Sequence, residues 1–258
     1  MKLKDNISIH FTELTKNDKK ITSQLMKTPD LLIDKAIQEA AVSLDVSPAA
    51  IMRTVKKLGY KGLSDFKNAL EEYKNELSGD IQQTEPTNFS HSIIQTYKNN
   101  LDAIAESFSE AQLKNIVHLM KTSKTTRALG IGSSGLSANQ FVYSFLYQEK
   151  YIEAVTSRTK IYYLSRDLDE NDLFIIYTVS GNLSVFQELF DQAKKKKAKI
   201  VLITMSHNDK LKKAADEIII LPSTLTDFSE QNSLRQLDNR FAFLVFSEIL
   251  AAYYLENH

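Results

Sequence analysis

Apolar side chains in the first part of the chain recur every three or four residues, and no run there has the composition of a strand. This spacing is typical of amphipathic helices. The positions that follow it are Ile21, Leu25, Ile37, Ala40, Ala41, Leu44, Ile51, Val55, Leu58, Phe66 and Leu70. We therefore expect an all-α N-terminal domain.

After a helical segment at about 89–121, the pattern changes to short apolar runs separated by segments of helix length. The runs are 127–131, 151–155, 173–179, 199–204 and 217–221. Such alternation predicts βαβ units, and hence an α/β domain with a parallel five-stranded sheet. The last apolar stretch, 241–255, contains Glu248 and is shorter than the ~20 residues of a membrane span. It predicts a buried helix and no membrane partner.

A polar segment separates the two patterns. Residues 79–88 contain Gly79 and Pro86 and have no periodic apolar face, as expected of a linker. The predicted organisation is therefore an N-terminal domain at 1–78, a linker at 79–88 and a C-terminal domain at 89–258.

Charge and composition narrow the function classes. The 258 residues include 32 Lys and Arg and 32 Asp and Glu, so any nucleic-acid binding must come from a local basic patch. The absence of Cys excludes disulfides, thiolate metal sites and cysteine nucleophiles. Residues 1–10 have no apolar run of signal-peptide length, so we expect a cytoplasmic protein.

A helix-turn-helix is predicted within the N-terminal domain. Residues 35–44 form one short amphipathic helix, and Asp45 and Val46 form a tight turn. Ser47 then caps a second helix, with Pro48 at its first position, where the missing N–H has no partner to lose. Two helices joined by so short a turn are typical of DNA-binding proteins, although helical pairs also bind proteins.

The second of these helices has one apolar and one polar face. Ile51, Val55 and Leu58 are expected to face inward, which leaves small residues and cations outward, toward base edges and phosphates. Residues 46–67 carry five basic side chains and one acidic one, Asp65. The candidate DNA-binding residues are Ser47, Ala49, Met52, Arg53, Lys56, Lys57 and Lys61.

Residues 14–77 resemble the N-terminal domain of the RpiR-type (MurR/RpiR) bacterial transcriptional regulators. The most specific part is the run Lys57-Leu58-Gly59-Tyr60-Lys61-Gly62 that follows the second helix. The resemblance implies binding to a double-stranded DNA operator. Two positions depart from the family pattern: Asp45 stands where a turn Gly is usual, and Ala50 where a hydroxyl residue is usual. Asp visits the left-handed region more readily than most residues, but Ala50 removes an expected DNA contact.

A Gly-rich turn follows the first predicted strand. Residues 130–135 read Gly-Ile-Gly-Ser-Ser-Gly and precede a segment of helical pattern, an arrangement that presents free N–H groups to an anion. The same letters match the dinucleotide fingerprint, with Glu153 about 20 residues on. Against that match, Glu153 lies inside its apolar run, and a dinucleotide does not require hydroxyls at both Ser133 and Ser134.

A second loop of similar chemistry follows the third predicted strand, before a helix expected from about Leu183. Two hydroxyl-bearing loops at the ends of strands can converge on one phosphate, whereas the alternative is that each Ser only caps its helix. The candidate phosphate-binding residues are Ser133, Ser134, Thr178, Val179, Ser180, Gly181 and Asn182. The pair of loops favours a ligand.

Residues 89–255 resemble the sugar isomerase (SIS) domain, a flavodoxin-like sheet that binds phosphosugars in amidotransferases, isomerases and RpiR-type regulators. The matching positions are Ser134 and residues 178–181, where the family pattern runs Ser-x-Ser-Gly-x-Thr. Leu183 replaces the final Thr, so one phosphate donor is missing. The resemblance implies a sugar-phosphate effector bound at these loops.

An isomerase needs a general base near the sugar carbon. The acidic and His side chains considered for this role are Glu149, His207, Glu230 and Glu248. They form no acid–base pair, and the His residues have no metal-ligand spacing. We expect no catalytic residues, no metal and no cofactor.

Our interpretation is a sugar-phosphate-responsive transcriptional regulator, with an N-terminal helix-turn-helix domain and a C-terminal SIS domain. It is expected to act as a homodimer or a dimer of dimers, because one helix-turn-helix reads few base pairs. The alternatives are a phosphosugar isomerase or lyase with an accessory helical domain, and a nucleotide-binding redox sensor.

Overall fold

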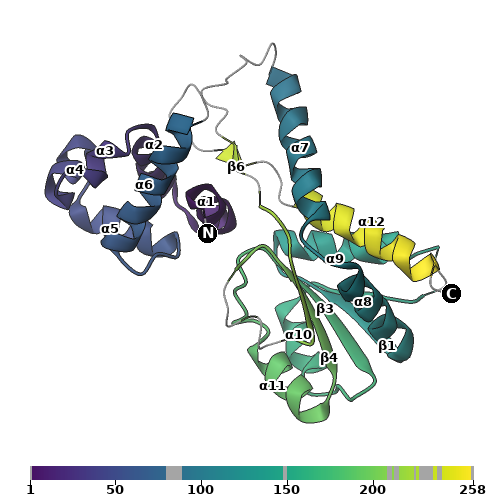
Figure 1. Ribbon diagram of the computed structural model, residues 1–258. Helices are drawn as coiled ribbons and strands as arrows, with labels where there is room; N and C mark the ends of the chain where they lie inside the picture. Colours follow the sequence, from purple (N-terminus) through teal and green to yellow (C-terminus); the bar gives the residue numbers. More distant parts are fainter. Residues whose placement is uncertain are drawn as a thin grey trace. The chain divides into compact units, whose positions relative to one another are not determined.

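The computed structural model describes residues 2–79, 89–147, 150–207, 211, 215–223, 225–226, 235–236 and 240–256. The chain divides into two compact units (Figure 1), one of Met1–Tyr97 with Ser223–Asp238 and the other of Lys98–Pro222 with Asn239–His258. The predicted linker at 79–88 lies outside the described residues except for Gly79, which ends a helix. The predicted domain boundaries stay a prediction.

The N-terminal unit is helical, as predicted. Its helices are α1 (Leu3–His10), η1 (Phe11–Glu13), α2 (Lys16–Lys27), α3 (Asp30–Ile33), α4 (Ile37–Ser43), α5 (Pro48–Lys57) and α6 (Leu63–Gly79). Ten of the eleven apolar positions that carried the prediction are buried in one core cluster, and Ile37 packs against it. The unit also includes a short antiparallel ladder of β6 (Leu225–Thr226) and β7 (Arg235–Gln236), which the sequence pattern did not predict.

The helical segment expected at 89–121 is two helices, α7 (Phe89–Ala105) and α8 (Glu110–Thr122). Ser109 separates them, because its hydroxyl accepts a hydrogen bond from the Gln112 N–H at 3.3 Å while Gln112 Oε1 accepts from the Ser109 N–H at 3.0 Å. This reciprocal pair is a capping box, which marks a helix start. The spacing of Ser109 and Gln112 was a sequence signal for the break.

The second unit contains the five-stranded parallel sheet that the alternating pattern predicted. Its strands are β1 (Thr125–Leu129), β2 (Glu153–Val155), β3 (Asp172–Thr178), β4 (Lys199–Thr204) and β5 (Glu217–Ile220). All neighbours pair in parallel, in the order β2-β1-β3-β4-β5. This is the flavodoxin-like order.

Helices cover both faces of the sheet (Figure 1). On one face α12 (Arg240–Glu256) packs with α9 (Ser133–Ser144) and with α8, and on the other α10 (Arg158–Leu164) packs with α11 (Gln187–Lys196). Tyr177 of β3 is fully buried and its hydroxyl lies 2.9 Å from that of Ser247 on α12. Burial on both faces explains why β3 carries a continuous apolar run at residues 173–177.

The stretch at 241–255 forms α12, whose inner face is buried as predicted. No helix in the described part of the chain is long and apolar enough to cross a membrane.

Candidate functional sites

The turn between α4 and α5 has the geometry of a helix-turn-helix. Asp45 adopts a left-handed conformation with φ of 53°, so Asp fills the position where the family usually has Gly. The N–H of Val46 donates to Ala41 O at 3.0 Å, which closes the turn on α4. Ser47 caps α5 as predicted, since its hydroxyl accepts from the Ala50 N–H at 3.2 Å.

The end of α5 explains the Lys-Leu-Gly-Tyr run. Gly59 has φ of 84°, and a Cβ on it would lie 2.9 Å from Nε2 of His10 on α1. Tyr60 N–H donates back to Val55 O at 3.3 Å, which ends the helix. The Tyr60 ring is buried and meets Phe66 edge to face, with centroids 5.1 Å apart. Only Gly fits both the conformation and the contact with α1.

The exposed face of α5 differs in part from the predicted one. Ala49, Arg53 and Lys56 are exposed, and Met52 is half-buried. Ala50 is buried at 7% exposure and faces the core. A hydroxyl residue at this position would therefore not point toward DNA, so the Ala costs no DNA contact.

The predicted basic patch is partly used inside the unit. Lys57 was expected to face outward, but it is half-buried and its ammonium group lies 2.5 Å from Oδ2 of Asp18 on α2. Lys67 donates to the carbonyl oxygens of Ile33 and Lys35 at 3.2 and 3.1 Å. Lys56 donates to Lys61 O. The sequence did not reveal these contacts because the partners are distant or are backbone atoms.

The two predicted phosphate loops leave the sheet side by side. Leu129, the last residue of β1, pairs with Ile176 of β3, and the loops follow these adjacent strands at the same edge. In the sheet, β2 lies on one side of β1 and β3 lies on the other, so the chain reverses its direction of progress across the sheet after β2. This is the topological switch point, where open α/β sheets bind ligands.

Glycines shape the first loop. A Cβ on Gly130 would lie 2.3 Å from Ser134 O, and Gly132 has φ of 63°. Gly132 is also the N-cap of α9, with no side-chain cap, so Ser133 and Ser134 lie in the first turn and do not cap the helix. Ser133 is exposed and Ser134 is buried at 7% exposure.

The dinucleotide alternative loses its acidic residue in the structure. Glu153 begins β2, and its carboxylate lies 3.3 Å from Nε of Arg127 on β1. A ribose-binding acid belongs at the carboxyl end of that strand. Glu153 therefore serves an ion pair within the sheet.

The second loop follows β3 directly. Thr178 is the last residue of β3 and is buried, and Ser180 in the loop is half-buried. Gly181 has φ of 69°, and a Cβ there would lie 2.8 Å from Ser206 Cβ. Asn182 Oδ1 accepts from the Ser184 N–H at 3.0 Å, which orders the exposed end of the loop.

The helix after this loop starts later than expected. α11 begins at Gln187, its N-cap is Phe186, and no side chain caps it. Residues 183–186 form a turn in which Phe186 N–H donates to Leu183 O at 2.8 Å. The start predicted at about Leu183 is wrong by four residues, because residues 183–186 form this turn before α11 begins. Ser180 therefore does not cap α11.

A third loop, which the sequence interpretation missed, supports the second. Met205, just after β4, donates its N–H to Val179 O at 3.4 Å. Ser206 is buried, packs near Gly181, and donates its N–H to Thr204 Oγ1 at 3.1 Å. The sequence contained a signal for this loop, because a hydroxyl residue follows β4 as hydroxyl residues follow β1 and β3.

Of the four acidic and His candidates for catalysis, the structure describes Glu248 and His207. Glu149 and Glu230 lie outside the described residues. Glu248, expected in a buried helix as a core or interface carboxylate, is exposed and accepts from Ser144 Oγ at 2.6 Å. His207 is exposed after β4. The described residues contain no group of three or more His, Cys, Asp or Glu side chains arranged for a metal.

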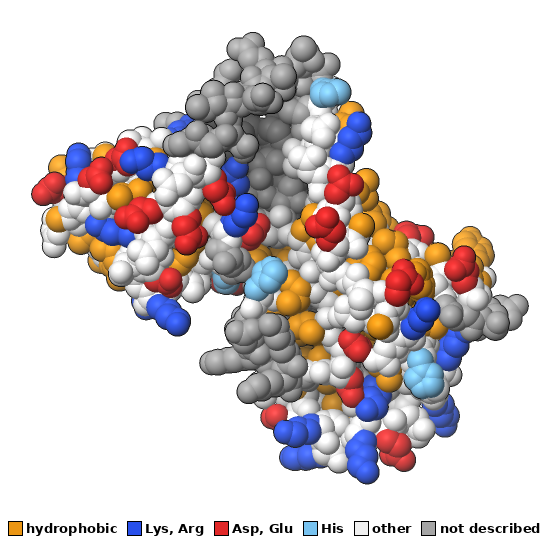
Figure 2. All heavy atoms as spheres, in the orientation of Figure 1, with side chains coloured by type: hydrophobic (Ala, Val, Ile, Leu, Met, Phe, Trp, Pro, Cys, Tyr) orange, Lys and Arg blue, Asp and Glu red, His pale blue; other side chains and the backbone are white. Residues whose placement is uncertain are grey.

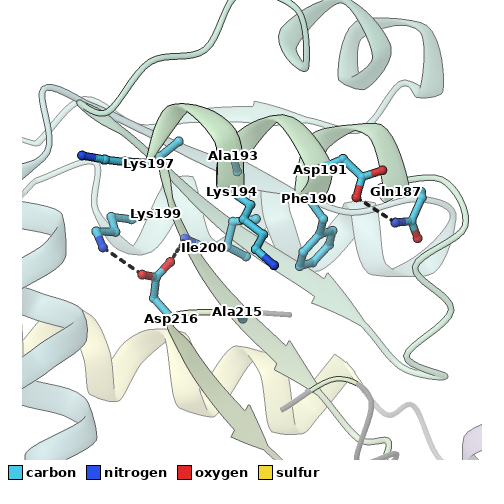
Figure 3. A pocket seen from close by; sticks show the side chains of 11 residues that line it. Gln187, Phe190, Asp191, Ala193, Lys194, Lys197, Lys199, Ile200, Ala215 and Asp216 are labelled. Atoms are coloured by element: carbon cyan, nitrogen blue, oxygen red, sulfur yellow. Dashed lines mark hydrogen bonds and ion pairs between the residues drawn. The ribbon is translucent and has the colours of Figure 1, made fainter. Parts of the chain in front are cut away.

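A cavity of about 520 Å³ lies at the opposite edge of the sheet (Figure 3). It is lined by Phe190 and Lys194 of α11 and by the residues that begin β4, with Asp216 across from them. Asp216 pairs with Lys199 at 2.9 Å and accepts from the Ile200 N–H at 2.9 Å. These contacts tie the start of β4 to the segment before β5, away from the phosphate loops.

A helix-turn-helix unit joined to a flavodoxin-like sheet with a ligand edge defines the class of DNA-binding regulators with an effector domain. Residues 1–76 match the model of the helix-turn-helix domain of the rpiR family, and residues 119–239 match the SIS domain. The chain therefore belongs to the RpiR-type helix-turn-helix transcriptional regulators, which confirms the resemblance in both halves of the sequence.

Individual relatives agree with this assignment. The chain is 26% identical over 229 residues to the transcriptional regulator RpiR of Escherichia coli K12, covering 85% of this chain and 76% of that protein. It is 24% identical over 250 residues to a helix-turn-helix regulator of Clostridium perfringens, covering 94% and 90%. Among solved structures, Vibrio vulnificus NanR complexed with ManNAc-6P has the same fold, with a TM-score of 0.57, 18% identity and coverage of 95% and 88%.

Proposed function

We propose that the chain binds an operator duplex through the exposed face of α5 and that a phosphosugar at the sheet edge controls this binding. The residues proposed to contact DNA are Ser47, Ala49, Met52, Arg53, Lys56 and Lys61. Lys57 is left out because its ammonium group is paired with Asp18. The short polar and apolar residues at the start of α5 are suited to base edges, and Arg53 is suited to phosphate or guanine.

The effector site is proposed at the loops after β1 and β3. The observation that carries it is that hydroxyl groups of both loops lie at the switch point and cap neither following helix. The proposed ligand contacts are Ser133, Ser134, Thr178, Val179, Ser180, Gly181 and Asn182. The N-terminus of α9 adds free N–H groups, which favour an anion. The similar NanR structure holds a sugar phosphate, which supports this ligand class.

We infer that the active form is a homodimer or a dimer of dimers. One helix-turn-helix reads one half-site, so a second copy supplies the other. α9 contains no charged residue, yet Leu136 and Tyr143 on it are 54% and 67% exposed, and Tyr147 just beyond it is 87% exposed. Hydrophobic side chains also gather around α12 (Figure 2). Aromatic residues are enriched in the cores of protein interfaces.

The second domain is proposed to sense its ligand without converting it. The described residues near the two loops offer hydroxyl and backbone donors, and the acidic candidates that the structure describes lie elsewhere. If the second domain converts a phosphosugar, a phosphosugar isomerase function replaces this proposal.

The test is a binding screen of the full chain against hexose, amino-sugar and N-acetylmuramic acid phosphates, with inorganic phosphate and the free sugars as controls. Thermal shift detects ligands, because a ligand at 100 times its Kd stabilises the protein by ~2.7 kcal/mol. Each ligand is then incubated with the protein and analysed for conversion. Binding without conversion supports a sensor. Conversion at enzymic rates contradicts it.

A further inference from the structure

A buried carboxylate connects α2 to the proposed recognition helix. Asp18 lies in the first turn of α2 and is 6% exposed. Its carboxylate accepts hydrogen bonds from Thr15 N–H at 2.9 Å, Thr15 Oγ1 at 2.6 Å, Thr54 Oγ1 at 2.8 Å and Lys57 Nζ at 2.5 Å. Two of these donors belong to α2's own cap and two belong to α5. The carboxylate therefore links the two helices directly.

Asp18 is charged throughout the physiological range. Burial raises the pKa of Asp18, but the hydrogen bonds from Lys57, Thr15 and Thr54 together lower it to about 2. Its contact with Lys57 is thus an ion pair whose carboxylate is almost inaccessible to water. Removing Lys57 would leave the buried Asp18 carboxylate without a cation, whereas the half-exposed Lys57 ammonium group remains accessible to water.

The two α5 residues that Asp18 holds lie beside the two that face outward. Thr54 and Lys57 are three positions apart, so they share one face of α5. Arg53 and Lys56, each one position earlier, share the exposed face. A rotation of α5 about its axis that redirected Arg53 and Lys56 would break the bonds of Thr54 and Lys57 to Asp18.

We propose that Asp18 is a positioning residue for DNA recognition, which fixes the rotation of α5 and removes Lys57 from the cations available to phosphate. The inference rests on the proposed binding of DNA by α5. It assigns a recognition role to a residue on a different helix that does not itself contact the duplex.

Positioning and phosphate contact have different signatures. A residue that contacts phosphate strengthens binding equally for all sequences, and its loss flattens the slope of log K against log salt by ~0.9. A residue that orients the helix changes the fit to base edges. Loss of an orienting residue lowers the ratio of the affinities for the preferred and scrambled duplexes, but it does not flatten the slope of log K against log salt.

The experiment uses the full chain and the duplex that the wild-type protein selects from a randomised pool, with a scrambled duplex as the reference. Both affinities are measured over a salt series at a temperature where circular dichroism shows each variant folded. Asp18→Asn is expected to lower the ratio of the two affinities at least tenfold. Asp30→Asn is the matched control, because it breaks a half-exposed ion pair with Lys74 in the same unit. The control is expected to leave the ratio unchanged.

Lys57 provides a second pair of variants that does not depend on whether Asp18→Asn folds. Lys57→Arg retains the ion pair and is expected to keep the affinity ratio. Lys57→Met breaks the pair and is expected to lower the ratio severalfold, with the salt slope unchanged. Lys57→Met leaves the buried Asp18 carboxylate without its cation, so circular dichroism must show this variant folded at the temperature of the binding measurement.

Three results would overturn the inference. The first is an Asp18→Asn protein that melts at a lower temperature but keeps the affinity ratio, since Asp18 would then only stabilise the fold. The second is a Lys57→Met protein with a flatter salt slope and an unchanged ratio, since Lys57 would then contact phosphate. The third is a Lys57→Arg protein as impaired as Lys57→Met. If the wild type selects no duplex, the proposed function itself fails, and the inference fails with it.

Discussion

The helix-turn-helix and the sheet-edge loops both present polar groups, but different parts of the chain hold them in place. α5 is fixed by side chains, since Asp18 of α2 bonds Thr54 and Lys57. The two loops are shaped by the backbone, since Gly130 and Gly181 lie where any side chain would overlap a neighbour. The first region is therefore sensitive to loss of a side-chain group, and the second to gain of a Cβ.

The largest effect is expected for Gly130→Ala. The new Cβ would meet Ser134 O, a backbone atom, at 2.3 Å, so the loop or the start of α9 must move. We expect a loss of about 3 kcal/mol or more in the free energy of unfolding of the second unit. Gly62→Ala is the control, because nothing lies within 4 Å of its Cβ position and φ is not left-handed there. Urea unfolding followed by circular dichroism compares them, and equal stability of the two variants would contradict the close approach.

The next effect concerns ligand affinity. Ser134→Ala and Ser180→Ala are each expected to weaken phosphosugar binding by about 1.5–3 kcal/mol, because each removes a hydrogen bond to a charged group. Their melting temperatures should change little, since neither hydroxyl caps a helix. Ser144→Ala, on the same helix α9 but bonded to Glu248, is the control. Calorimetric titration checks the affinities, and wild-type affinity in both variants would exclude these loops as the site.

The side-chain link in the first unit predicts a dependence on pH. The pKa of Asp18 in the folded protein is about 2, below its ordinary value of 3.8, so ionised Asp18 favours the folded state. This contribution of about 2 kcal/mol is complete above about pH 5 and is lost as the pH falls through 2. The stability difference between wild type and Asp18→Asn should shrink by about 1 kcal/mol from pH 7 to pH 3. Urea unfolding at both pH values tests this, and a constant difference would contradict it.

A smaller effect is expected on the exposed face of α5. Arg53→Ala should weaken binding to the selected duplex and flatten the slope of log K against log salt by ~0.9, because one phosphate contact is lost. Fluorescence anisotropy over a salt series measures both quantities. An unchanged affinity and slope would remove this face from the interface.

The sequence predicted the elements whose signals are local. Alternating apolar runs predicted the five strands within a few residues, and the 199–204 run matches β4 at both ends. Ser47 and Pro48 predicted the start of α5, because a cap and an N1 proline need no distant partner. Helical spacing likewise predicted the core of the first unit.

The features that the sequence did not predict depend on contacts between distant residues. Lys57 has the spacing of an exposed cation, and only its approach to Asp18, 39 positions earlier, turns it inward. Residues 183–186 have a helix-compatible pattern, yet they form a turn closed by the bond from Phe186 N–H to Leu183 O, so α11 starts later. At the phosphate loops, spacing predicted the residues, but strand order was needed to bring the two loops together.

We propose that the phosphosugar site and the DNA-binding helix are energetically coupled, and reciprocal binding measurements test this coupling. The affinity of the full chain for its selected duplex is measured with and without the phosphosugar that the screen identifies, and the affinity for the phosphosugar with and without duplex. Coupling of 1–3 kcal/mol predicts a change of ~5–150-fold, equal in both directions because linkage is reciprocal. A phosphosugar that binds at the loops and leaves duplex affinity unchanged would show that the two sites are not coupled.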